Sequence, residues 1–384
     1  MEDKARKIGI YVHIPFCLRK CSYCDFYSLG SFENGLLEQY VKALIKEIEE
    51  IELKEDAIFP TVYIGGGTPS LLSGSQMELL LKTLNRKFNL RKDTEITVEA
   101  NPATLPESRI SHFYNAGVNR FSLGVQSFDN FELEVLGRTH TVKEVFETVD
   151  ALHRSGIKNF NLDIIYGIPD QTVKKWENNI KKAIECNPSH ISMYLLQLDE
   201  STPLAKRITE GKFTLPDEEM VSDFYYIGTE YLENSGFEHY ELSNFCRPGF
   251  VCRHNMIYWH AEEYIGLGAG AVSYLEGRRF VNIASVYEYI RRLEKGLKPL
   301  QEELEFMNTS EMLAADAIIL GLRLCRGINL LEFKMRFGID IEKKYKTIIE
   351  KYEKEKLLEI KNGYIYLTKK GYFISNDILC RFIV

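Results

Sequence analysis

The sequence predicts an α/β protein built from about six βα units, with a smaller C-terminal α+β domain that is winged-helix-like. From Ile8 to about Leu198, short β-rich runs alternate with amphipathic helical stretches, which is typical of βα units around a parallel sheet. Near the C-terminus, helical segments precede LLEIKNGYIYLTKKGYF, in which Asn362-Gly363 between alternating apolar residues predicts a β-hairpin. Six units are too few for a closed eight-unit barrel, so the pattern alone allows a partial barrel or an open doubly wound sheet.

Each of the six expected strands is either apolar or alternating, as a covered strand should be. The strands are expected at 8–13, 61–65, 94–99, 118–125, 159–165 and 190–196. Helical periodicity fills the gaps between them and is clearest at 37–51, where apolar residues recur at three- and four-residue steps. In such folds the chemistry occurs at the carboxyl ends of the strands.

Three domains are expected, with the last boundary at Lys298-Pro299. Residues 1–200 hold the βα units, 201–297 form an extension with a helix at 285–296, and 298–384 form the winged-helix-like domain. Winged helices often bind DNA, but 331–361 mixes nine Lys and Arg with seven Asp and Glu instead of forming a basic stripe. We therefore expect a packing or lid role for this domain and no nucleic-acid partner.

Composition and charge narrow the class of protein further. A net charge of −7 argues against a protein that holds nucleic acid mainly by its overall field. The N-terminus lacks the apolar stretch of a signal peptide, and no segment offers the ~20 apolar residues that span a bilayer. Three of the eight cysteines lie within eight positions, which favours a metal site over a disulfide framework. We expect a cytoplasmic protein without a transmembrane segment.

The three clustered cysteines form the pattern Cys17-x3-Cys21-x2-Cys24, directly after the first expected strand. Three thiolates can bind three irons of a [4Fe-4S] cluster and leave the fourth iron open for another ligand. Arg19 and Lys20 between them are expected to favour the thiolate form. The alternative is a structural zinc site, for which His13 could supply the fourth ligand.

The segment CLRKCSYCDF resembles the C-x3-C-x2-C-x-aromatic loop of the radical S-adenosylmethionine (SAM) superfamily. Around it, YVHIPFC, IGGGTPS, EANP, GVQSF, LGRTH and LDIIYGIP resemble, in order and over nearly the whole chain, the family of oxygen-independent coproporphyrinogen III oxidase and its HemW heme chaperone branch. The resemblance implies a partial (β/α)6 radical-SAM barrel, with a [4Fe-4S] cluster on the three cysteines and SAM on the open iron.

The same resemblance implies two groups of binding residues at the strand ends. The group that would hold SAM on the cluster consists of Tyr11, Gly66, Gly67, Thr68 and Glu99. A second SAM or substrate-side site would be lined by Gln126, Arg138 and Asp163. Each residue also has a plainer interpretation. The glycines could form a flexible turn, Glu99 could cap a helix, and Arg138 could form a surface ion pair.

Two features favour the chaperone branch of this family. The oxidase branch carries a further cysteine two residues past its third ligand, where this chain has Phe26. Residues 254–259 read HNMIYW, which fits the H-N-x-x-Y-W motif of the HemW branch. The resemblance therefore implies a heme chaperone that binds heme and delivers it to an acceptor hemoprotein. The alternative is an oxidase that decarboxylates coproporphyrinogen III to protoporphyrinogen IX, so whether the chain is an enzyme stays open.

For the heme, His254 is the candidate axial ligand, and Tyr258 and Trp259 could offer flat faces to a porphyrin. Cys252 and His260 are rival ligands. In the alternative interpretation His254 is structural, and Cys246-x5-Cys252-x-His254 could also be a second metal site. The expected partners are heme or a porphyrin, SAM, an acceptor hemoprotein, an electron donor such as flavodoxin or ferredoxin, and a second copy of the chain in a homodimer.

Overall fold

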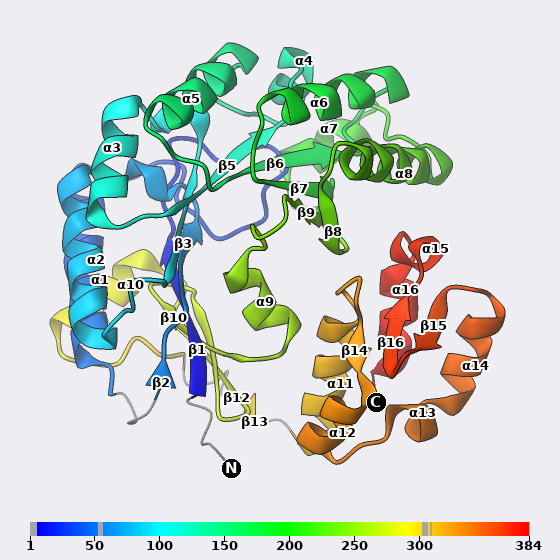
Figure 1. Ribbon diagram of the computed structural model, residues 1–384. Helices are drawn as coiled ribbons and strands as arrows, with labels where there is room; N and C mark the ends of the chain where they lie inside the picture. Colours follow the sequence, from blue (N-terminus) through cyan, green and yellow to red (C-terminus); the bar gives the residue numbers. More distant parts are fainter. Residues whose placement is uncertain (1–5, 53–56, 302–305, 308, 384) are drawn as a thin grey trace.

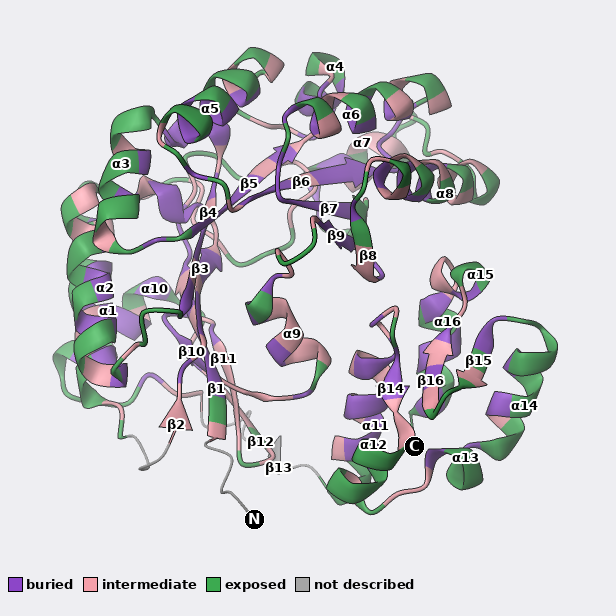
Figure 2. Ribbon diagram, viewed as in Figure 1, coloured by how far each residue is buried: buried purple, intermediate pink, exposed green. Residues whose placement is uncertain are grey.

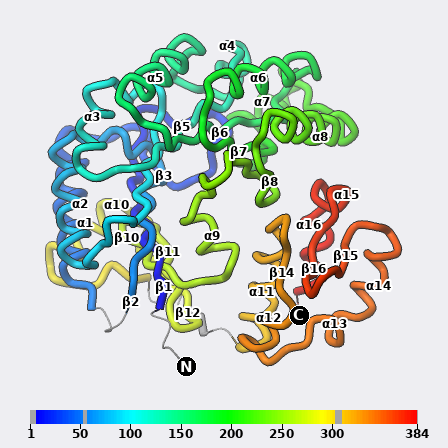
Figure 3. The backbone as a smooth tube through the Cα atoms, viewed as in Figure 1, coloured from blue at the N-terminus to red at the C-terminus, as the bar shows by residue number. Residues whose placement is uncertain are grey.

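The computed structural model in Figure 1 describes residues 6–52, 57–301, 306–307 and 309–383. A single large sheet curves around the molecule, and helices cover its outer face. A smaller lobe formed by the C-terminal residues lies beside the open side of the sheet, as the chain trace in Figure 3 also shows. In the described part of the chain, no helix combines the length and the apolar character needed to cross a membrane.

All six predicted strands are present. They are β1 (Arg6–Ile14), β3 (Thr61–Gly66), β4 (Glu95–Ala100), β5 (Arg120–Gln126), β6 (Phe160–Tyr166) and β7 (His190–Leu195). They are parallel and adjacent in this order, as a chain of βα units requires. The α/β fold class with a parallel sheet is therefore confirmed.

The helices that follow the strands pack their apolar faces on the sheet. The long ones are α1 (Leu36–Glu50), α2 (Gly74–Phe88), α3 (Glu107–Ala116), α5 (Val142–Arg154), α6 (Val173–Glu185) and α8 (Glu218–Asn234). Shorter turns of helix are η1 (Pro69–Leu71), η2 (Pro102–Thr104), α4 (Asn130–Val135) and α7 (Pro203–Thr209). Figure 2 shows the strands buried and the outer helix faces exposed. The main apolar core thus lies between the sheet and this helical layer.

The sheet extends beyond the predicted strands at both edges. On one side, β10 (Glu263–Leu267) runs parallel to β1 and is followed by antiparallel β11 (Val272–Leu275), β12 (Arg278–Val281) and β13 (Phe306–Met307). On the other side, β9 (Asn244–Cys246) and β8 (Glu238–Glu241) follow β7. The short strand β2 (Ala57–Ile58) pairs with the start of β1. Sequence analysis missed β10 and β11 because glycine-rich segments are weak strand formers. The two edge strands, β13 and β8, do not pair in the described sheet, so it stays open.

The C-terminal lobe combines helices with a three-stranded sheet. Its elements are α11 (Ser310–Gly321), β14 (Ile328–Asn329), α12 (Leu330–Phe337), α13 (Ile341–Lys344), α14 (Lys346–Lys354), β15 (Leu358–Lys361), β16 (Tyr364–Leu367), α15 (Lys369–Tyr372), α16 (Ser375–Leu379) and η4 (Cys380–Phe382). The turn at Asn362 and Gly363 has φ of 51° and 78°, as a type I′ hairpin turn requires, so the predicted hairpin is confirmed.

The lobe has its own apolar core, drawn almost entirely from residues after 313. The expected helix at 285–296 is α10 (Val286–Glu294), which packs against α1 in the main core. These two observations support a boundary between residue 294 and residue 310, although Lys298-Pro299 itself stays a prediction.

Candidate iron–sulfur and ligand site

The cysteine loop follows β1 and is fixed at the carboxyl edge of the sheet by backbone hydrogen bonds. The N–H of Cys17 donates to the carbonyl of Leu29 at 2.9 Å, and the N–H of Leu29 donates to the carbonyl of Pro15 at 2.8 Å. Farther along the loop, the Oγ of Ser22 donates to the carbonyl of Val135 at 2.8 Å. The thiols of Cys17, Cys21 and Cys24 are free and half-buried. The loop therefore offers three thiols from an ordered backbone.

Two side chains reach the cysteine sulfurs, Thr68 from the segment after β3 and Arg138 from the segment after α4. The Nη1 of Arg138 lies 3.2 Å from the Sγ of Cys21, and its Nη2 donates to the carbonyl of Gly124 at 2.7 Å. The hydroxyl of Thr68 lies 3.6 Å from the Sγ of Cys17. Burial opposes the charge of Arg138, but Cys21, Tyr23 and Cys17 together outweigh it and raise the pKa of the guanidinium. Arg138 is therefore not a surface ion pair, because its cation is held against a thiol.

At Cys24 the neighbouring cation acts in the expected direction, but burial of the thiol outweighs it. Burial raises the pKa of this thiol, and the positive charge of Lys20 lowers it by less. The free thiol is therefore the favoured form of Cys24 in this structure. A metal reverses this preference because coordination deprotonates a thiol directly.

The geometry of the loop does not favour a zinc site. In the described part of the chain, no three His, Cys, Asp or Glu side chains converge on a point where one metal ion could be held. No such group is formed by the three loop cysteines with His13, or by Cys246 and Cys252 with His254. A [4Fe-4S] cluster makes a different demand, because each thiolate binds its own iron at a separate corner. Free thiols, hydrogen-bond donors beside two sulfurs and a buried cation fit such a cluster.

Glu99 at the end of β4 is bound to the glycine-rich segment after β3. Its carboxylate accepts the hydroxyl of Tyr63 at 2.8 Å and the backbone N–H of Gly66 at 3.0 Å. Burial raises the pKa of Glu99 to about 7, although both hydrogen bonds oppose the shift. Glu99 caps no helix in this structure. A carboxylate at this place suits ribose hydroxyls, so SAM binding by Glu99 stays a prediction.

The glycine run is a packed segment and not a flexible turn. A Cβ at Gly67 would lie 2.6 Å from the carbonyl oxygen of Phe16, so only glycine allows this backbone to approach the start of the cysteine loop. At Gly66, where φ is 112°, a Cβ would lie 2.6 Å from the Cε1 of His13. The missing side chains thus bring the end of β3, the imidazole of His13 and the cysteine loop together.

The second predicted group gathers around Gly124 of β5. The register of β5 and β6 pairs Gly124 with Asp163. A Cβ at Gly124 would lie 2.9 Å from the Nε2 of Gln126 and 3.2 Å from the Nη2 of Arg138. The Oδ1 of Asp163 accepts the side chain of Asn161 at 2.8 Å, and burial raises the pKa of Asp163. The structure brings these predicted residues together, while their binding role stays a prediction.

A set of polar side chains inside the curved sheet was, apart from Asp163, not predicted from the sequence. Tyr63 is one of them, and it stacks on His254 with ring centroids 5.1 Å apart. Others alternate along the strands, two residues apart. These pairs are Glu95 and Thr97, Arg120 and Ser122, Asn161 and Asp163, and His190 and Ser192. The signal was present, because strands covered on both faces are expected to be apolar throughout, and polar residues at every second position contradict that pattern.

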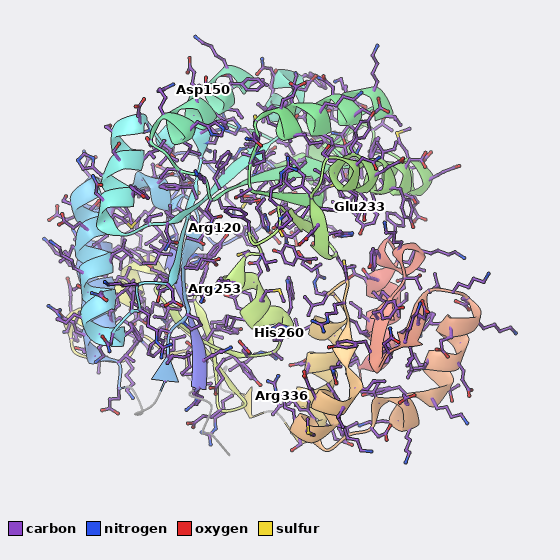
Figure 4. All side chains as sticks on the ribbon, in the orientation of Figure 1. Arg120, Asp150, Glu233, Arg253, His260 and Arg336 are labelled. Carbon is purple, nitrogen blue, oxygen red and sulfur yellow. The ribbon has the colours of Figure 1, made fainter. Side chains whose placement is uncertain are left out.

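The HNMIYW motif forms helix α9 (Arg253–Trp259), which lies in the opening of the curved sheet. Glu95 accepts the backbone N–H groups of Arg253 and His254, each at 3.0 Å. Figure 4 shows Arg253 on this helix and Arg120 on the strand side facing it. A carboxylate at a helix N-terminus is favourable because it compensates the unpaired N–H groups and the helix dipole.

His254 itself is buried, with 1% of its surface exposed. Its Nδ1 lies 2.8 Å from the hydroxyl of Thr61, and its Nε2 lies 3.0 Å from the hydroxyl of Tyr258. Neither ring nitrogen is free in this structure, so iron ligation would require one of these bonds to break. Of the two rivals, Cys252 is fully buried, and burial raises the pKa of its thiol to about 12.

The end of α9 joins the C-terminal lobe. The guanidinium of Arg323 lies 4.6 Å from the centre of the Trp259 ring. Arg336 of α12 donates to the carbonyls of His260 and Ala261 at 2.7 and 2.5 Å, and Figure 4 shows Arg336 and His260 on the facing sides of the two parts. The motif therefore connects the interior of the sheet with the C-terminal lobe.

Two protein-family models and several curated relatives match this chain. The model of the radical SAM superfamily matches residues 11–183, and that of the HemN C-terminal domain matches residues 308–374. The chain is 36% identical to the heme chaperone HemW of Lactococcus lactis over 97% of both chains. It is 34% identical to the heme chaperone HemW of Bacillus subtilis over 97% of this chain and 98% of that one.

A solved structure shows the same fold. The coproporphyrinogen III oxidase HemN of Escherichia coli, described as a radical SAM enzyme, superposes with a TM-score of 0.85 over 98% of this chain and 90% of that one. The two sequences are 22% identical, so this likeness speaks for the fold alone.

Proposed function

Because this chain belongs to the heme chaperone HemW family of radical SAM proteins, we propose that it binds heme and delivers it to an acceptor hemoprotein. The observation that carries the proposal is the match to curated heme chaperones along almost the full length of both chains. The family's cofactors are a [4Fe-4S] cluster and SAM, and the open iron of such a cluster binds SAM and supplies an electron to it.

The residues proposed to hold these cofactors lie at one edge of the sheet. Cys17, Cys21 and Cys24 are proposed as the cluster ligands, and the hydrogen-bond donors of Arg138 and Thr68 beside their sulfurs support the assignment. SAM is proposed to lie along the glycine run and Glu99, whose buried carboxylate faces the backbone of that run. Gln126, Arg138 and Asp163 are proposed to line the neighbouring site.

Phe26 separates this proposal from the oxidase alternative. It occupies the position two residues past the third cysteine, and 69% of its side chain is exposed. A phenyl group supplies neither a thiol nor a proton there.

The proposed partners are an acceptor hemoprotein, an electron donor of the flavodoxin or ferredoxin type and a second copy of the chain. The proposed location is the cytoplasm.

The test is an anaerobic pair of assays on the full-length chain after its cluster has been reconstituted. One assay supplies coproporphyrinogen III, SAM and a reductant and follows decarboxylated products by chromatography. The other titrates heme, follows the Soret band, and then adds an apo-hemoprotein as acceptor. We expect stoichiometric heme binding and transfer without decarboxylation. Formation of protoporphyrinogen IX without tight heme binding would contradict the proposal.

A further inference from the structure

A cavity lined with aromatic side chains lies beside the cysteine loop. Its volume is about 330 Å³, near the lower end of the range for small-molecule sites. The aromatic and imidazole rings that line it come from four segments, namely β1, the cysteine loop, α9 and β10. They are Tyr11, His13, Phe26, Tyr27, Tyr258 and Tyr264. Flat apolar walls of this kind suit a planar ligand better than a small polar one.

The cavity is open on the side of the cysteine loop. Phe26 is 69% exposed and Tyr27 is 38% exposed, whereas the opposite wall consists of half-buried Tyr258 and Tyr264, whose ring centroids lie 4.8 Å apart. A planar ligand inserted here would keep one edge outside the protein. Such partial burial is what a protein that hands its ligand to another protein requires, because the acceptor must reach the ligand.

His13 is the one histidine among the described residues that line the cavity. The Nδ1 of its ring lies 2.8 Å from the hydroxyl of Tyr11, while its Nε2 has only a long contact of 3.4 Å with the carbonyl oxygen of Tyr27. A hydrogen bond of that length is weak. In the tautomer with the proton on Nδ1, that N–H donates a hydrogen bond to the hydroxyl oxygen of Tyr11, and Nε2 keeps a lone pair for a metal.

This arrangement is the one that metal-binding histidines use, since the ring nitrogen away from the metal is normally fixed by a hydrogen bond. Burial lowers the pKa of His13, which favours the neutral imidazole. The absence of a side chain at Gly66 leaves room for the ring, because a Cβ there would lie 2.6 Å from its Cε1. In contrast, both ring nitrogens of His254 have short contacts with hydroxyl groups, Nδ1 with Thr61 at 2.8 Å and Nε2 with Tyr258 at 3.0 Å.

We infer that the heme macrocycle docks in this aromatic cavity and that His13 is the imidazole that ligates its iron. The inference rests on the proposed heme-binding function and deepens it by naming the place and the ligand. Tyr258 then forms the wall between the macrocycle and His254, which accounts for a structural histidine behind a ligand cavity. Tyr11 also belongs to the predicted SAM group, so the cavity and the SAM site share one wall.

The test compares heme affinity and the Soret spectrum among variants of the reconstituted full-length chain. His13→Ala should bind heme at least about tenfold more weakly, with a shifted Soret band, and added imidazole should restore the band position. His112→Ala, which removes an exposed histidine elsewhere, should match the parent protein. Phe26→Ser should weaken binding several-fold, whereas Tyr114→Ser, at a tyrosine that is 51% exposed on α3, should not.

Each other outcome overturns the inference in a recognisable way. If the parent chain binds no heme, the proposed function itself fails. If it binds heme and His13→Ala is unchanged while His254→Ala loses the ferric heme spectrum, the ligand is His254. If excess SAM displaces heme, and His13→Ala weakens SAM binding but not heme binding, the cavity belongs to SAM. Should His13→Ala lose its cluster or its circular dichroism spectrum, the exposed pair tests the docking instead, and equal heme affinity in Phe26→Ser and Tyr114→Ser overturns it.

Discussion

Glu95 at the start of β4 accepts the backbone N–H of His254 at 3.0 Å, although 159 positions separate the two residues. The same carboxylate accepts the N–H of Arg253. One buried side chain therefore caps the N-terminus of α9 and attaches the HNMIYW motif to the sheet. It also lies near the buried guanidinium of Arg120. Glu95 thus compensates both a helix N-terminus and an internal cation.

From this arrangement we expect Glu95→Ala to destabilise the chain by roughly 2–4 kcal/mol, because it leaves the N–H groups of Arg253 and His254 without their acceptor. It also removes a negative charge near the buried guanidinium of Arg120. Glu95→Gln should cost about 1–2 kcal/mol, since its amide oxygen can still accept one N–H. Urea unfolding measures both values. Glu78→Ala, in an exposed pair with Lys82, is the control and should leave the free energy of unfolding nearly unchanged. An equally small effect of Glu95→Ala would refute the assigned role.

The second prediction concerns the cluster ligands. Cys17→Ser should lose most of the bound iron and the brown colour after reconstitution, because serine supplies no thiolate to bind iron. The matched control is Cys380→Ser, which removes an exposed free thiol in the C-terminal lobe. Iron and sulfide analysis decides the matter. Equal iron content in the two variants would show that Cys17 is not a ligand.

Arg138 provides a third prediction, for the reduction potential of the cluster. A cation and a hydrogen bond at the sulfur of Cys21 stabilise the more negative, reduced cluster. Arg138→Met should therefore lower the potential by roughly 65–130 mV, the equivalent of a hydrogen bond of about 1.5–3 kcal/mol to a charged group. A redox titration monitored by electron paramagnetic resonance without SAM measures the shift. A potential unchanged within about 20 mV would mean that Arg138 does not act on the bound cluster.

Glu47 of α1 predicts a pH-dependent stability. Its buried carboxylate accepts Gly268 N–H at 2.8 Å and the side chains of Asn282 at 2.6 Å and Tyr289 at 2.5 Å. Burial nevertheless raises its pKa from 4.5 to about 7. Between these two values the folded chain holds more protons than the unfolded chain, so this carboxyl lowers stability as pH rises through that window.

The effect is absent below about pH 4.5 and complete above about pH 7. Glu47→Gln carries no such proton, so its stability relative to the parent should rise by up to about 3 kcal/mol between pH 4.5 and pH 8. Denaturant unfolding at several pH values measures the difference. Glu49→Gln, on an exposed carboxylate of the same helix, should differ from the parent in stability by an amount that does not change with pH. The same pH-independent difference for Glu47→Gln would mean that its carboxyl titrates normally in the folded chain.

Local sequence patterns predicted much of this protein. Alternating apolar runs located six parallel strands, and Asn362-Gly363 located the hairpin, because strand periodicity and a type I′ turn depend on neighbouring residues. The cysteine spacing indicated the kind of site, since three thiolates on one short loop are a local feature. Polar residues at alternate strand positions, such as Arg120 and Ser122, also indicated a polar interior, because strands covered on both faces are otherwise apolar.

The order of residues along the chain thus specifies the set of elements and the residue types at the strand ends. The three-dimensional arrangement is needed to show that Glu95 caps α9, that Arg138 reaches Cys21, and that β10 lies beside β1. These contacts join segments more than a hundred residues apart, and they form because buried charges and backbone N–H groups must find partners once water is excluded. No periodicity along the chain records which partner will be near, because that proximity is created when the sheet curves and α9 enters its opening.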